Sequence, residues 1–188
     1  MTIPPFFAEQ QCVVLGRRLL QQLHAALERD HGPQAAAVLQ EAGFAGGGQL
    51  YSAFASWVTA TYEVPDPGEL DQAHLSEALT QFFLAAGWGP LTAHPLGDAV
   101  LALDATHWAE AGEVGSSEFP SCHLSCGLLA EFFGRLSGQV TAVMQVECPS
   151  RGDARARFLA GAPETLSLVY DRMAQGMTYD QALGLVPA

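Results

Sequence analysis

Hydrophobic residues recur at helical spacing through the first half of the chain, with arginine, glutamine and glutamate between them. The pattern predicts four helices, over residues 7–29, 33–43, 49–62 and 71–86. Gly32-Pro33 separates the first two, because glycine ends helices and proline suits a first helical turn. Gly43 is expected to stop the second helix, and the glycines at 46–48 to form a flexible break before the third.

The second half contains both helical and strand periods. Partial two-residue alternation predicts two hairpins, formed by residues 91–96 with 98–105 and by residues 139–148 with 154–160. A helix is predicted between them over 122–136, and short helices follow over 163–176 and 178–186. This order predicts an α+β fold, with an antiparallel sheet of two hairpins flanked by helices.

Length and composition narrow the class of protein. The 188 residues are expected to form a single domain, 1–188, and a hydrophobic fraction of 49% excludes a disordered chain. The 20 acidic side chains outnumber 8 basic ones, and the net charge of -12 disfavours nucleic-acid binding. No signal peptide or membrane span is recognisable, so a cytoplasmic protein is predicted, with its 4 cysteines reduced.

Motifs for nucleotide and hydrolytic chemistry are missing from the sequence. It contains no glycine-rich phosphate loop, nucleophile elbow or His-Glu-x-x-His motif, and it has no lysine for a Schiff base. We therefore expect no catalytic residues and no cofactor. His107-Trp108 follows an apolar strand and could hold an aromatic ligand, although a core tryptophan beside a surface histidine is the more ordinary explanation.

Two thiols are predicted at the ends of elements that can meet in space. Cys122 begins the 122–136 helix, and Cys148 ends a predicted strand. The spacing from Cys122 to Cys126 is not that of a zinc knuckle. The residues alone therefore favour small buried thiols over a metal site.

The segments CHLSCGLLAEFFGRL and QVECPSRGDARARF resemble the C-terminal signature of the 4-vinyl-reductase-type domain. Cys122 and Gly127 match its first cysteine and the glycine five residues later, and Cys148, Gly152 and Asp153 match its second block. The resemblance implies a small-molecule-binding module. The family includes hydrocarbon-binding proteins, aromatic-sensing parts of bacterial transcription activators and a bacteriochlorophyll-biosynthesis protein. It shares the fold of the TRAPP vesicle-tethering subunits.

The resemblance also implies a structural zinc, which the aromatic-sensing members hold with one glutamate and three cysteines. Here Gln145 replaces the glutamate and Ala156 the last cysteine, so only His123 or Cys126 could complete the set. We therefore predict no bound metal. The helix and the strand after it are expected to be held by apolar packing, of Leu124, Leu128 and Phe132 against Val140, Met144 and Val146.

The leading hypothesis is a non-enzymatic homodimeric sensor or carrier that encloses a small hydrophobic or aromatic molecule and signals to a protein partner. Its predicted ligand-binding residues are Trp88, His107, Trp108, Phe132 and Phe133. The first helix and the face with Phe54 and Trp57 are the predicted dimer contacts.

Two alternatives stay open. One is a scaffold or tethering-type protein without a ligand, in which a channel could admit an acyl chain attached to Cys12, Cys122 or Cys126. The other is a tetrapyrrole-related reductase, which the missing nucleotide fingerprint disfavours.

Overall fold

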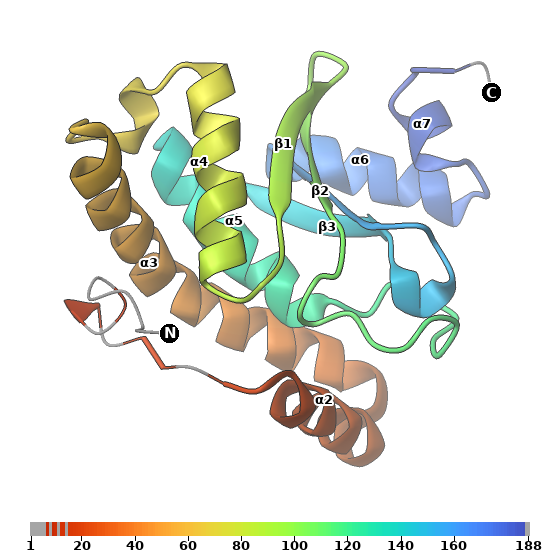
Figure 1. The fold of residues 1–188 in the computed structure, drawn as a ribbon. Coiled ribbons are helices and arrows are strands. Elements are labelled where there is room, and N and C mark those ends of the chain that lie inside the picture. Colours follow the sequence, from red (N-terminus) through yellow and green to blue (C-terminus); the bar gives the residue numbers. More distant parts are fainter. Residues whose placement is uncertain (1–6, 8, 11, 14, 187–188) are drawn as a thin grey trace.

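Four strands form one sheet with helices on both faces (Figure 1). The computed structural model describes residues 7, 9, 10, 12, 13 and 15–186. The helices are α2 (Arg17–His31), α3 (Ala35–Tyr62), α4 (Gln72–Ala85), α5 (His123–Ser137), α6 (Pro163–Ala174) and α7 (Tyr179–Ala182). The strands are β1 (Leu91–Leu96), β2 (Val100–Ala105), β3 (Ala142–Glu147) and β4 (Ala156–Gly161). Short 3-10 turns occur at η1 (Gly32–Gln34), η2 (Pro67–Glu69) and η3 (Pro149–Arg151).

Both predicted hairpins are present in the sheet. β1 pairs with β2 and β3 pairs with β4, and the two hairpins join through β2 and β4 to give the order β1-β2-β4-β3. Every pairing is antiparallel. The predicted α+β fold with an antiparallel sheet of two hairpins is therefore confirmed.

The two faces of the sheet belong to separate cores, because side chains alternate along each strand. Leu103 and Phe158 point to the face covered by α3, α4 and α5, and the larger core lies there. Val100 and Leu159 point to the opposite face, where α6 and α7 cover a smaller core (Figure 1). The larger core contains most of the aromatic side chains and is the natural place to look for a ligand site.

The predicted packing between α5 and β3 is wrong. Leu128 and Phe132 lie in the larger core, as expected of a helix with apolar residues four apart. Met144 and Val146, however, face α6 and α7, and Val140 is 83% exposed. The alternation on β3 is real, but the stripe that it defines belongs to the smaller core.

Helix α3 runs unbroken, so the predicted stop at Gly43 and the predicted break at 46–48 are wrong. These glycines lie where α3 crosses α5 at close range. A Cβ atom on Gly43 would lie 2.0 Å from the Leu124 carbonyl oxygen, and one on Gly127 would lie 1.9 Å from a carbonyl oxygen of α3. No side chain fits between backbones this close, so the crossing requires glycine and its packing offsets the poor helix propensity of that residue.

The first helix is shorter than predicted. Helix α2 begins at Arg17, after Gly16 in an extended conformation, and the described residues between 12 and 16 are not helical. Phe7 lies apart from α2 and packs into the larger core. Residues 8, 11 and 14 of the predicted helix lie outside the described residues.

The face of α3 predicted as a dimer contact belongs to the core. Phe54 is fully buried, and its ring stacks on that of Trp57 with 6.3 Å between centroids. Trp57 also packs against Phe82 of α4. Helix α4 therefore covers the apolar groups that were assigned to a second subunit.

A β-bulge at Val146 resets the alternation of β3. Gln145 and Glu147 pair with consecutive residues of β4, which leaves Val146 as an extra residue. Gln145 and Cys148 consequently point to the α5 side of the sheet, whereas Glu147 points to the other side and contacts α7. Strict alternation would have sent Cys148 to the same side as Val146.

Candidate functional site

Four of the five predicted ligand-binding residues lie in one aromatic cluster of the larger core. The ring centroids of Trp88 and Trp108 are 5.4 Å apart, as are those of Phe132 and Phe133. Phe83 of α4 joins the two pairs, at 5.8 Å from Trp108 and 5.3 Å from Phe132. The rings come from α4, α5 and the loops before β1 and after β2, so the tertiary fold assembles the cluster.

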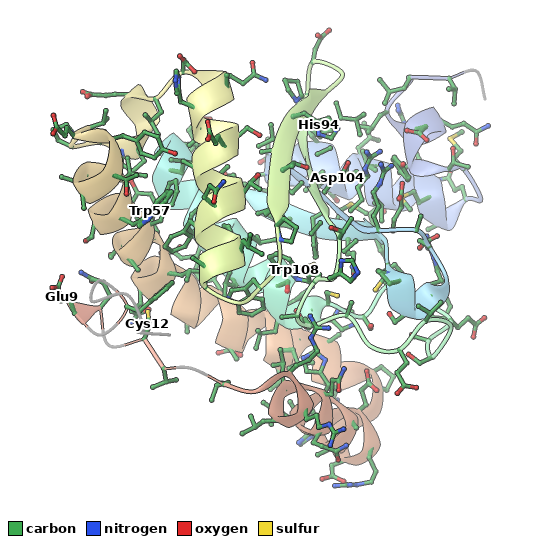
Figure 2. All side chains as sticks on the ribbon, viewed as in Figure 1. Glu9, Cys12, Trp57, His94, Asp104 and Trp108 are labelled. Carbon is green, nitrogen blue, oxygen red and sulfur yellow. The ribbon has the colours of Figure 1, made fainter. Side chains whose placement is uncertain are left out.

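Further rings extend this cluster, and the sequence analysis did not select them. They are Phe158, Tyr51, Phe54, Phe82 and Trp57. Figure 2 shows Trp108 beside the sheet and Trp57 towards the other end of the cluster, on α3. Single aromatic residues in helices are common core residues, so nothing in the sequence distinguished these rings from the selected ones.

The fifth predicted residue, His107, does not join the cluster. It is exposed, its φ of 57° is left-handed, and its carbonyl oxygen accepts a hydrogen bond of 2.8 Å from the Arg17 guanidinium. Non-glycine residues rarely adopt this conformation. Here it leaves two successive residues, Thr106 and His107, at the surface and directs Trp108 into the core.

A buried polar chain borders the aromatic cluster. Trp108 Nε1 donates to Ser125 Oγ at 2.7 Å, and Ser125 Oγ donates to the Glu110 carboxylate. Glu110 also accepts from the backbone N–H groups of Leu124 and Ser125, at 2.9 and 2.6 Å. The carboxylate therefore caps the first turn of α5, where the helix dipole favours negative charge. His24 Nε2 of α2 lies 3.1 Å from it.

Side chains occupy the interior in which a ligand was expected. Trp108, Phe132 and Phe133 are buried, and two open hollows on the described surface lie elsewhere. One of about 500 Å³ follows α6 and is lined by Pro163, Glu164, Ser167, Leu168 and Asp171. The other, of about 280 Å³, is lined by Ala45, Gly48, Gln49, Ser52, Glu131 and Arg135. A molecule that enters the aromatic cluster must therefore displace side chains.

Cys122 and Cys148 meet behind the cluster. Their Sγ atoms are 3.9 Å apart, and Cys148 Sγ lies 2.8 Å from Ser150 Oγ. The hydrogen bond from the Cys122 thiol lowers the pKa of Cys148, and the Ser150 hydroxyl adds to this effect while burial opposes it. The same contact, together with burial, raises the pKa of Cys122. The pair is a thiol beside a thiolate.

The residues around this pair do not fit a tetrahedral zinc ion. Gln145 turns its Oε1 atom to the backbone N–H of Cys122, at 2.9 Å, and Ala156 is buried without a donor atom. Within the part of the chain that the structure describes, no three His, Cys, Asp or Glu side chains are grouped to hold a metal. Burial raises the pKa of Cys126 and lowers that of His123, so neither change favours a fuller ligand set of charged thiolates.

A second polar network lies on the outer face of the sheet. Arg157 makes a bidentate pair with Asp104, with both N···O distances 2.7 Å, and donates to Tyr179 of α7 at 3.0 Å. Arg155 pairs with Glu147, which also accepts from the Tyr179 hydroxyl. These charged groups satisfy one another, so the network ties α7 to the sheet.

The family assignment rests on this half of the chain. Residues 107–162 match the model of the 4-vinyl-reductase domain. This chain contains a 4-vinyl-reductase domain. The matched residues of that domain include Trp108, Glu110, α5 and the thiol pair, so both parts of the candidate site lie within it. A comparison with curated proteins gives no match.

Solved structures share the fold of this 4-vinyl-reductase-domain protein. The phenol-responsive sensory domain of the transcription activator PoxR, with phenol, has a TM-score of 0.59 at 14% identity, over 81% of this chain and 77% of that one. A trafficking protein particle complex subunit 3 from Naegleria fowleri, covalently bound to palmitic acid, has a TM-score of 0.59 at 11% identity, over 77% and 91%. The predicted resemblance to the TRAPP fold is confirmed.

A vinyl-4-reductase family protein from Methanocaldococcus jannaschii is a more distant match, with a TM-score of 0.43 at 19% identity over 65% of this chain and 66% of that one. The helices of the described residues offer no segment with the length and apolar character of a membrane crossing.

Proposed function

We propose that this 4-vinyl-reductase domain is a non-enzymatic sensor or carrier of a small hydrophobic or aromatic molecule. The supporting observation is the aromatic cluster bordered by one buried polar chain, because ligand sites for such molecules combine apolar walls with few polar groups. The phenol response of PoxR and the palmitic acid on the trafficking subunit favour the same broad class of ligand.

The proposed entry to the site is at Trp88. Its ring is half-buried, and it lies between Gly87 and Gly89, which both have positive φ angles of 83° and 109°. Its backbone is held at both polar groups, by a bond of 3.0 Å to the Phe83 carbonyl and one of 2.8 Å from the Ala109 N–H. The Trp88 side chain can therefore rotate off Trp108 without moving the strands, and the ligand takes its place.

The polar chain supplies the anchor for a ligand with one polar group. Trp108 Nε1 and Ser125 Oγ bond each other at 2.7 Å, and both lie at the boundary of the ring cluster. A hydroxyl that enters beside them can accept from the indole and donate towards Glu110. Buried polar groups that already have partners lose nothing when the ligand is absent.

The proposed assembly is a homodimer formed through α2. Leu15, Leu19 and Leu23 are four residues apart and 57%, 52% and 44% exposed, while α2 itself buries His24. Three leucines in one row form an apolar stripe that a second copy can cover with the same stripe, as a two-fold interface requires.

Binding of phenol and 1-naphthol tests the ligand proposal, measured by calorimetry and tryptophan fluorescence. Both probes should bind the wild-type protein, and Trp88→Ala should bind them about tenfold more tightly because no ring must be displaced first. Trp57→Ala is the matched control, since Trp57 is also half-buried against the core, and its affinity should stay at the wild-type value.

Two results would overturn the proposal. One is a wild-type protein that binds neither probe, even if Trp88→Ala binds them, because the variant would then contain an artificial cavity. The other is equal tightening in both variants, which would point to general loosening of the core.

A further inference from the structure

Two buried thiols from different elements are in contact. Cys122 lies at the start of α5 and Cys148 at the end of β3, and the Sγ–Sγ distance is 3.9 Å. They are 26 residues apart in sequence, and the bulge at Val146 turns Cys148 to this side of the sheet. Since the described residues around them offer no metal site, the pair needs another explanation.

We propose that Cys122 and Cys148 form a reversible intramolecular disulfide on exposure to a hydroperoxide such as hydrogen peroxide. The sulfur atoms of a disulfide are about 2.05 Å apart, so a modest approach of two side chains closes the bond. The Ser150 hydroxyl, 2.8 Å from Cys148 Sγ, is placed to stabilise a negative charge on that sulfur.

The chemistry balances with hydrogen peroxide as the oxidant. Cys148 Sγ attacks one peroxide oxygen, the O–O bond breaks, and hydroxide leaves and takes a proton to become water. Cys122 Sγ then attacks the sulfenic sulfur, the S–O bond breaks, and the second oxygen leaves as water with the Cys122 proton. Two thiols and one peroxide become one disulfide and two water molecules.

A weakly packed loop covers the pair and provides access. Residues 112–121 contact η3 through hydrogen bonds, from Ser117 N to Ser150 O at 2.8 Å and between the Ser121 and Ser150 hydroxyls at 2.8 Å. Its large apolar side chains, Val114 and Phe119, are 78% and 68% exposed and so do not fix it to the core. Segments with few buried apolar contacts open at low free-energy cost, and a small peroxide can then enter.

The disulfide would fasten the first turn of α5 to the sheet beside the aromatic cluster. This proposal does not depend on ligand binding, and its test measures covalent state. Native protein treated with millimolar hydrogen peroxide should lose two hydrogen atoms, and a non-reducing peptide map should join the peptides of Cys122 and Cys148. Dithiothreitol should reverse the change, and oxidation should raise the Tm by roughly 5 to 10 °C.

Single serine variants provide the controls. Cys122→Ser and Cys148→Ser should each abolish the mass change, whereas Cys126→Ser, at a neighbouring buried thiol, should leave it intact. Circular dichroism identifies a variant that does not fold, and the wild-type peptide map decides the question without it. A native protein that keeps four free thiols, a bridge that includes Cys12 or Cys126, or oxidation only after unfolding would each overturn the proposal.

Discussion

Phe132 is the residue at which the aromatic cluster converges. Its ring lies between 5.3 and 5.8 Å from those of Tyr51, Phe54, Phe83 and Phe133, measured between centroids. These partners belong to three helices, so the phenylalanine joins α3, α4 and α5. Its burial follows from the four-residue spacing that the sequence shows.

Replacing Phe132 with alanine should lower the free energy of unfolding by about 3 to 5 kcal/mol, because the ring leaves a cavity that the surrounding side chains cannot close. Urea denaturation measures the loss. Phe119→Ala, at an exposed ring of the 112–121 loop, should change it by less than about 0.5 kcal/mol. Equal effects at both positions would refute the central placement of Phe132.

Glycine at the α3–α5 crossing shows that one residue type can have two structural meanings. In a single sequence, a run of glycines at 46–48 is typical of a break, and that prediction failed here. The reason is tertiary: Gly43 and Gly47 face the α5 backbone, whereas Gly46 has open space around its Cβ position. The four-residue spacing of Gly43 and Gly47 was the available signal, since it places both on one helix face.

Alanine at two neighbouring glycines should therefore have opposite effects. Gly43→Ala should destabilise the protein by about 3 kcal/mol, since the new methyl group would meet the Leu124 carbonyl. Gly46→Ala should stabilise it by about 0.5 to 1 kcal/mol, because alanine favours the helix and nothing lies within 4 Å. Thermal and urea unfolding of the two variants measure the contrast, and a loss in both would support a flexible joint instead.

Local patterns predicted the hairpins, the helices from 71 onward and the clustering of four site residues, because each depends on spacing along one element. The polar part of the site could not be found in this way. Glu110 lies in a loop, and its value as a cap depends on α5 approaching it from 14 residues further along the chain. The turn at His107 is equally invisible, since histidine has no strong preference for a left-handed conformation.

At the scale of the whole molecule, the outer network makes stability depend on pH. Burial raises the pKa of Asp104, but hydrogen bonding and charge from Arg157, with the charges of Arg155 and His94, outweigh it and lower the pKa below its usual value. A lowered folded-state pKa means that the unfolded chain binds the proton more readily. The stabilisation is complete above the ordinary pKa of about 3.9 and is lost as the pH falls through the folded-state value.

Asp104→Asn should accordingly reduce stability at pH 7 by about 1.5 to 3 kcal/mol, a typical contribution for hydrogen bonds to a charged group. The gap from wild type should close as the pH falls from about 5 towards 2, because the carboxylate is then protonated in both states. Urea titrations across this range measure it. Asp98→Asn, at an exposed turn, should show no such trend, and a constant gap for Asp104→Asn would contradict the linkage.

The oligomeric state is a second property of the whole molecule. The double variant L19E/L23E should change a dimer to a monomer in light scattering coupled to size exclusion, since charge in the stripe opposes self-association. Leu168→Glu is the control, because its side chain is 50% exposed, like that of Leu19, but lies on α6. A monomeric wild-type protein, or dissociation by Leu168→Glu alone, would exclude the α2 interface.

The extra residue in β3 also determines where the chain can change its length. Deleting Val146 would restore regular pleating while leaving the Glu147 carboxylate towards Tyr179 and the Cys148 sulfur towards α5, so the deletion would cost only the packing of one valine. Deleting Val143 instead would reverse the sides of the residues before the bulge. Within this strand, a one-residue difference in length is therefore tolerable at a single position, and alignments that place the gap elsewhere would mismatch both faces of the sheet.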